Sequence, residues 1–157
     1  MGGLSLLAAA AVLCASGCGV SLRAAELTLV IHDSGISFAR TADAALVAGG
    51  ETVLRIRNES ATAARVVLVR SRKDPQDLPD SIRDENLRVA GDRVLASTSE
   101  LEAQEATFAS GGLGYKVETG SLHVYLDPDE VYLLLDAQSP PDAARYLRLT
   151  PTGDDQT

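Results

Sequence analysis

Two histidines are the only imidazole groups of this 157-residue chain, and with a neighbouring carboxylate they are its candidates for metal binding. His32, His123 and Asp33 supply nitrogen and oxygen ligands of the kind that Cu(II) or Zn(II) takes in proteins. The two histidines lie on different predicted strands. His123 stands between the apolar Leu122 and Val124, and strand alternation therefore places it on an outward face. The sequence favours separate polar residues over a shared metal site, and we predict no resident cofactor.

His32, Asp33 and Ser34 are also the three residue types of a hydrolase triad. Consecutive side chains on an extended strand point to opposite faces, so these three cannot converge on one substrate atom. The segment 33–35 is instead typical of a turn. The acidic turns at 74–77 and 127–130 lack the ligand number and spacing of a calcium site. No catalytic residue is predicted, and the chain is not expected to be an enzyme.

Charge and composition exclude one class of partner. The chain has 22 acidic and 14 basic residues, a formal net charge of -8, and no tryptophan. Such a surface repels nucleic acid and offers few aromatic rings for stacking on bases. Arg55 and Arg57, with Arg65 or Arg70, form a candidate basic stripe for an acidic protein partner. Charge pairs on the solvated face of a sheet are the interpretation we favour for them.

Both cysteines lie within the first 18 residues. The segment 4–13 is apolar, and Ala15-Ser16-Gly17-Cys18 follows it, which resembles the lipobox of a bacterial lipoprotein. The resemblance implies that residues 1–17 are a signal peptide, that Cys18 is lipidated, and that 18–25 is a short tether. The protein is then expected in the cell envelope, anchored to a membrane by its lipid and facing the periplasm or the cell surface. Cleavage after Gly17 without lipid attachment is the alternative.

Short segments with period-2 alternation, separated by Gly, Pro and Asp turns, predict an all-β sandwich over 26–150. We expect a hairpin at Gly49-Gly50, a short helix within 97–106 from the capping-box spacing of Ser99 and Glu102, and a disordered tail at 151–157. The predicted strands are 26–31, 44–48, 51–58, 65–70, 114–118, 122–126, 131–135 and 146–150, with one or two more within 86–95.

The order of three stretches resembles the cupredoxin family. They are Ser37-Phe38 followed by 47–58, then 65–79, and then the strand-turn-strand segment 122–135. The resemblance implies a Greek-key β-sandwich, and in a blue copper protein it implies His, Cys, His and Met ligands. The first histidine is expected in 59–65 and the Cys, His and Met in the loop that follows Leu135, yet neither 59–65 nor 136–142 contains any of these residues.

Two hypotheses follow. The first is an exported lipoprotein whose copper-less cupredoxin-like domain acts as an accessory or interaction module in the cell envelope. The alternative is a copper-binding protein, in electron transfer or copper handling, that uses a non-standard site with His32 or His123.

Overall fold

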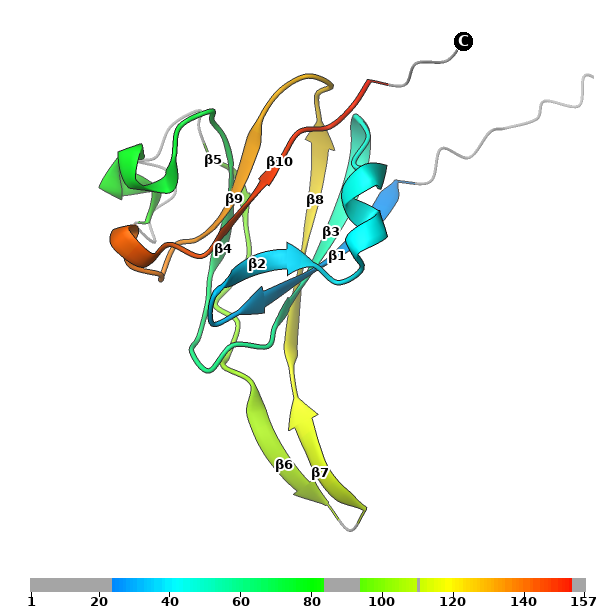
Figure 1. The fold of residues 1–157 in the computed structure, drawn as a ribbon, viewed down its shortest axis with the longest axis vertical. Coiled ribbons are helices and arrows are strands. Elements are labelled where there is room, and N and C mark those ends of the chain that lie inside the picture. The colour runs from blue at the N-terminus through cyan, green and yellow to red at the C-terminus, as the bar shows by residue number, and fades with distance from the viewer. Residues whose placement is uncertain (1–23, 84–93, 110, 154–157) are drawn as a thin grey trace, which may run out of the picture.

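The computed structural model of this protein describes residues 24–83, 94–109 and 111–153. Two four-stranded sheets face each other, and a two-stranded hairpin extends from one end of them (Figure 1). The sheet orders are β2-β1-β3-β8 and β10-β9-β4-β5, and the hairpin is β6-β7. The strands are β1 (Ala25–His32), β2 (Gly35–Phe38), β3 (Gly50–Asn58), β4 (Val66–Arg70), β5 (Val94–Ser97), β6 (Glu105–Ala109), β7 (Gly112–Lys116), β8 (Glu118–Leu126), β9 (Tyr132–Asp136) and β10 (Tyr146–Leu149).

The main core lies between the two sheets. In β3, Leu54 and Ile56 are buried whereas Arg55 and Arg57 are exposed, as the period-2 pattern predicted. β1 runs parallel to β3, so that its alternate apolar residues extend the same inner face. The second sheet supplies Val66, Leu68, Tyr132 and Leu134 to this core, among others. The predicted all-β sandwich is therefore confirmed for the described residues.

A second apolar cluster covers the other face of β4 and β9. Val67 and Val69 pack there with Leu133, Leu135 and Ala137. Two 3-10 helical turns, η2 (Pro75–Asp77) and η3 (Asp80–Ile82), bring Leu78 and Ile82 onto this face. Because both faces are covered, these central strands are apolar without alternation, which explains the continuous run at 66–69.

Two predicted elements were wrong. The helix expected within 97–106 is absent: β5 ends at Ser97, and Leu101 forms a β-bridge with Ala64. Burial of Leu101 in the main core outweighs the local capping-box signal of Ser99 and Glu102. The strand expected at 44–48 is also absent, because η1 (Thr41–Leu46) occupies most of it as a 3-10 helix.

The glycine pairs have other roles than predicted. Gly49-Gly50 joins η1 and Val47 to β3 and does not close a hairpin. Gly111-Gly112, which follows the segment predicted as a helix, lies at the tip of the β6-β7 hairpin, where Gly112 has a φ of 120°. That left-handed conformation is the one for which a glycine is favoured.

The described chain continues past Thr150, so the tail predicted at 151–157 does not begin at residue 151. Pro151 is buried, and Thr152 pairs with Ala48 through hydrogen bonds to both neighbours of that residue. At the other end β1 already begins at Ala25, inside the predicted tether. The predicted signal peptide, Cys18, most of the tether, most of 86–95 and residues 154–157 lie outside the described residues.

Candidate functional site

The two segments where the resemblance places copper ligands lie side by side at one end of the sandwich. The backbone N–H of Ala137 donates to the carbonyl oxygen of Arg65 at 2.8 Å, and the N–H of Arg65 donates to Asp136 Oδ1 at 3.0 Å. We call residues 58–65 and 136–145 the loop end. Its polar side chains are the candidate site, because this is where the fold brings the ligand positions together.

Asn58 organises the first half of the loop end. Its side-chain nitrogen lies 2.9 to 3.0 Å from the carbonyl oxygens of Thr62, Leu101 and Glu102. Its Oδ1 accepts hydrogen bonds from both the backbone N–H and the hydroxyl of Ser60. Asn58 is fully buried, so these contacts replace water for every polar atom of its amide. The residue closes the loop after β3 and ties it to the segment that leads into β6.

A buried ion pair organises the second half. Asp136 is fully buried, and its Oδ2 accepts hydrogen bonds from Nε and Nη2 of Arg145, whose side chain is 9% exposed. Its Oδ1 accepts backbone N–H groups of Arg65 and Gln138. Ser139 completes the loop, because its hydroxyl donates to the carbonyl of Asp136 and accepts the N–H of Arg145. The carboxylate therefore holds both halves of the loop end through charge-assisted bonds.

A cleft of about 620 Å³ opens beside this ion pair. Three polar residues of its lining are already engaged within the protein: Arg145 bonds to Asp136, Ser139 bonds to the same residue, and Asp33 accepts the backbone N–H of Ala61 at 2.8 Å. These bonds position the loops that surround the cleft. The full lining is Asp33, Thr62, Ala63, Gln138, Ser139, Pro140, Ala143 and Arg145.

The structure does not bring the two predicted histidines together. His32 is the last residue of β1, is exposed, and its Nε2 lies 3.2 Å from the hydroxyl of Ser37 on β2. His123 lies on β8 opposite Val53 of β3, and Val53 pairs in turn with Glu26 near the start of β1. His32 lies six positions further along β1 than Glu26, about 20 Å along the strand. The two imidazoles cannot ligate one ion.

Asp33 does not join either histidine in a metal cluster. Within residues 24–83, 94–109 and 111–153, no group of three or more His, Cys, Asp or Glu side chains lies close enough to hold a metal ion. The orientation predicted for His123 agrees with its exposure, since Leu122 is buried and Val124 packs against the core. The geometry of the described residues therefore gives Asp33 a role in fixing the loop at Ala61.

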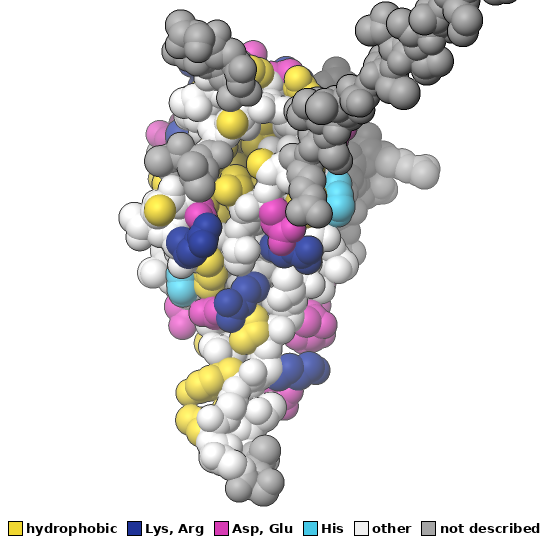
Figure 2. Space-filling model, turned by 90° about the vertical axis from the view of Figure 1, so that its right-hand side faces the viewer, with side chains coloured by type: hydrophobic (Ala, Val, Ile, Leu, Met, Phe, Trp, Pro, Cys, Tyr) yellow, Lys and Arg dark blue, Asp and Glu magenta, His cyan; other side chains and the backbone are white. Residues whose placement is uncertain are grey.

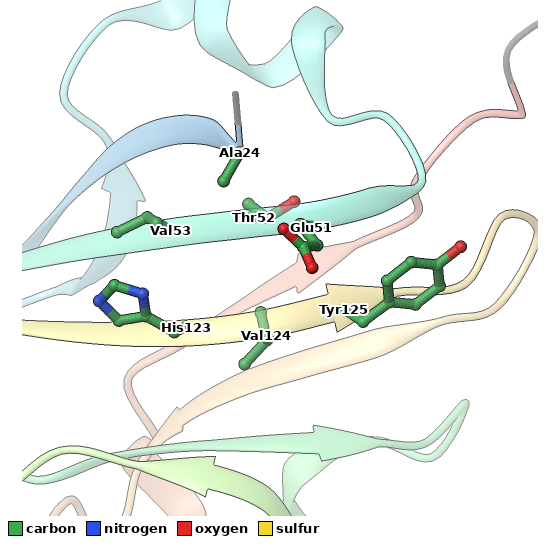
Figure 3. A pocket seen from close by; sticks show the side chains of 7 residues that line it. All are labelled: Ala24, Glu51, Thr52, Val53, His123, Val124 and Tyr125. Carbon is green, nitrogen blue, oxygen red and sulfur yellow. The ribbon is translucent and has the colours of Figure 1, made fainter. Parts of the chain in front are cut away.

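A smaller cleft of about 340 Å³ lies beside His123 on the outer face of the first sheet (Figure 3). The side chains of Glu51, His123 and Tyr125 lie along it, on the neighbouring strands β3 and β8. This cleft offers one imidazole, one carboxylate and one phenol. That set is one or more ligands short of a closed zinc or copper site.

The candidate basic stripe is a set of ion pairs. Arg55 pairs with Glu26 on the neighbouring strand, and Arg57 with Glu59 at 2.6 Å. Arg65 belongs elsewhere, because its side chain is buried and donates to the carbonyl of Arg83. Arg70 lies 3.6 Å from Asp127. The structure supports charge pairs, one of them between neighbouring strands, in place of a basic docking patch.

Beside Arg70 and Asp127, at the far end of β8, Tyr132 is buried. Its hydroxyl accepts the backbone N–H of Asp127 at 2.7 Å. Burial is the main cause that raises the pKa of the Tyr132 hydroxyl above its ordinary value of 10.0. The phenol is therefore neutral at physiological pH and acts as a fixed acceptor for the β8–β9 turn.

Three residues of the loop end were not predicted as a network: Asn58, Asp136 and Arg145. The sequence did contain a signal for Asn58 and Asp136. Asn58 continues the inward positions of Leu54 and Ile56, and Asp136 directly follows a fully buried apolar run. A polar residue at an inward strand position needs partners. The identity of these partners depends on contacts between residues as far as 71 positions apart in the chain.

This arrangement of strands defines a cupredoxin-like sandwich, which confirms the predicted fold class. Auracyanin B superposes with a TM-score of 0.51 and 18% identity, over 82% of this chain and 89% of that chain. The reduced auracyanin of the photosynthetic bacterium Roseiflexus castenholzii gives 0.47 and 13%, over 82% and 98% of the two chains. Auracyanin A of Chloroflexus aurantiacus, described as a "blue" copper protein, gives 0.44 and 13%, over 81% and 99%.

At these identities the likeness to auracyanin B shows the fold alone. No protein-family model matches the chain, and no curated protein sequence matches it. Among the described residues, no helix is long and apolar enough to cross a membrane.

Proposed function

We propose that this chain is an exported, lipid-anchored protein whose cupredoxin-like domain acts without copper, as an accessory or interaction module of the cell envelope. The observation that carries the copper-less part is the buried Asp136–Arg145 pair. It occupies the segment where the resemblance places the Cys-His-Met loop, and all the acceptor positions it offers are used by the protein itself.

The physical reason is that hydrogen bonds of Asp136 connect the two loops in the way that a bound metal ion would. A metal ion held by ligands from two loops stabilises both loops, and its binding free energy becomes folding free energy. Here the carboxylate of Asp136 bonds to Arg65 in one loop and to Arg145 in the other. Asn58 adds a second set of bonds at the same end. These contacts support a loop end that is folded in the absence of metal.

Titration with Cu(II) tests the copper-less part. We expect no absorption band at about 600 nm and no rise in melting temperature. Copper that did bind would be detected, since a ligand at a hundredfold excess over its Kd would stabilise the protein by about 2.7 kcal/mol. A variant with His32→Ala and His123→Ala serves as the matched control for weak surface binding. A blue band, or a copper-dependent stabilisation lost in the double variant, would favour the alternative copper-binding function.

Lipid anchoring is supported by the lipobox-like segment that ends at Cys18. In a bacterial host, Cys18→Ser is expected to abolish labelling with palmitate and to move the protein from the membrane fraction to the soluble envelope fraction. Cys14→Ser is the matched control, because that residue lies within the predicted signal peptide and should leave labelling unchanged. Equal labelling and equal fractionation of wild type and Cys18→Ser would contradict the anchor.

A further inference from the structure

The β6-β7 hairpin extends from the loop end beyond the sandwich and exposes an apolar face (Figure 1). Phe108 pairs with Leu113 and Ala106 with Tyr115, and alternation places all four side chains on one face of the hairpin. Phe108 is 84% exposed, Leu113 57% and Tyr115 59%, the first being the most exposed large hydrophobic residue of the described chain. Figure 2 shows hydrophobic side chains along one side of the narrow lower part of the molecule.

The other face of the hairpin is small and polar. Thr107 faces Gly114 there, and a Cβ on that glycine would lie 3.1 Å from the threonine hydroxyl. Glu105 pairs with Lys116 at the base. The hairpin is therefore amphipathic, yet no part of the described domain packs on its apolar side.

Exposing this apolar face to water costs free energy, and no packing contact within the described domain offsets that cost. On the scale of aromatic side-chain areas, the three large residues present about 400 Å² of apolar surface. A contiguous patch of that size is often functional. A two-stranded hairpin alone is also marginally stable in water. A binding partner that covers the face would remove both costs.

The root of the hairpin is held firmly by the loop end. Asn58 contacts the carbonyls of Leu101 and Glu102, and Gln104 donates its N–H to the carbonyl of Ser60 at 2.9 Å. On the other side, β7 leads into β8 through a single residue, Val117. The hairpin is thus presented in a defined direction before binding, which reduces the entropic cost of association.

Charge identifies the chemistry of the partner. A cleft of about 500 Å³ at the hairpin base is lined by Glu102, Glu105, Glu118 and Lys116, with Ala103 and Gln104. Three carboxylates against one ammonium give this cleft an acidic excess, on a chain whose net charge is already -8. A partner surface bordered by lysine or arginine would be attracted to it.

Two other occupants fit less well. A second copy that packed the same face would bury about 800 Å² in total, below the size of a stable interface, and would bring like charges together. A membrane with anionic lipids would be repelled by the acidic base. The predicted tether would also hold the membrane at the other end of the molecule. β1 begins at Ala25, which pairs with Thr52, and Thr52 pairs with Val124 at the end of β8 away from the hairpin.

We propose that the β6-β7 hairpin is the docking element of the module and inserts Phe108, Leu113 and Tyr115 into an apolar groove of another envelope protein, a groove bordered by basic side chains. This inference rests on the proposed function and names the surface that performs it.

The test uses the full chain in its host envelope, with the photo-crosslinking amino acid benzoylphenylalanine at one position at a time. Phe108 and Leu113 are expected to give one and the same protein adduct, and Thr107 on the opposite face is the matched control and should give none. The crosslinked peptide of the partner, found by mass spectrometry, is expected to lie in an apolar groove with lysine or arginine at its border.

The identified partner is then purified and its Kd for this protein is measured. Phe108→Ser is expected to raise the Kd at least tenfold, and Glu105→Lys to raise it and to reduce its dependence on salt, while Thr107→Ser leaves it unchanged. All three residues are exposed, so the melting temperatures should match the wild type. No adduct, an adduct with this same chain, or binding to vesicles of phosphatidylethanolamine and phosphatidylglycerol that depends on Phe108 would overturn the proposal.

The experiments distinguish a failure of the proposed copper-less function from a failure of the hairpin proposal. A blue copper band with hairpin adducts intact would refute the copper-less role alone. Loss of the adducts with no copper band would refute the hairpin alone.

Discussion

Replacing Arg145 by alanine is expected to lower the free energy of unfolding by about 3 to 5 kcal/mol. The substitution leaves the carboxylate of Asp136 fully buried, without its paired charge and without two of its four hydrogen bonds. Urea denaturation monitored by circular dichroism measures the change. It would appear as a lower denaturation midpoint with an unchanged slope if unfolding stays cooperative.

Two further variants identify the cause of that loss. Arg55→Ala breaks an ion pair whose side chains are 51% and 54% exposed, and should cost at most about 1 kcal/mol. The double change Asp136→Asn with Arg145→Met removes both charges and should recover a large part of the stability lost by Arg145→Ala alone. If Arg145→Ala costs no more than Arg55→Ala, the buried pair does not hold the loop end. If Arg145→Ala does not fold, Arg145→Lys is expected to fold with an intermediate loss, because it keeps the charge and loses the planar fork.

Replacing Asn58 by leucine is expected to cost about 3 kcal/mol, and more if the loop cannot rearrange, since each buried polar group left without a partner costs about 1 to 3 kcal/mol. The carbonyl of Glu102 loses its donor and the N–H of Ser60 loses its acceptor. The carbonyls of Thr62 and Leu101 each lose one of two donors, because the hydroxyl of Ser60 and the N–H of Ala64 still bond to them. Leucine has the same number of side-chain heavy atoms as asparagine and a larger volume, so no cavity explains this loss and overpacking would add to it.

Hydrogen exchange separates the specific effect from general destabilisation. In the wild type, the N–H groups of Leu101 and Gln104 bond to Ala64 and Ser60. We expect Asn58→Leu to accelerate exchange of these two amides more than that of Leu134 in β9. Thr52→Val is the matched control: it is buried on the same strand, bonds only to the carbonyl of Gly50, and should cost less than about 1 kcal/mol. A uniform acceleration of all three amides would contradict a local role for Asn58.

The strands were the part of the fold that the sequence predicted best. Leu54 and Ile56 alternate with Arg55 and Arg57, and this pattern is typical of a strand with one buried face and one solvent-exposed face. The strand predicted at 65–70 contains an apolar run at 66–69, which is typical of a strand covered on both faces, and η2 and η3 cover its second face. Turn chemistry located the ends of these strands, because Gly, Pro and Asp act through their own backbone preferences.

Other local signals were overridden by distant contacts. Ser99 and Glu102 have the spacing of a helix start, yet Leu101 between them is buried against residues of other strands and pairs with Ala64. A capping box contributes about 1 kcal/mol, whereas burying a leucine contributes about 1.5 to 3 kcal/mol, so tertiary packing decides.

The sequence alone established the net charge, the apolar N-terminal segment before Cys18, the alternation of the strands and the lack of His, Cys or Met in the segments where the cupredoxin resemblance expects ligands. Only the tertiary structure placed His32 and His123 at distant points of one sheet, paired Asp136 with Arg145, and left Phe108 exposed on a hairpin. The reason is that alternation and turn preferences act between neighbours in the chain. Partners of buried polar groups, and the faces that remain uncovered, are set by how separate strands pack together.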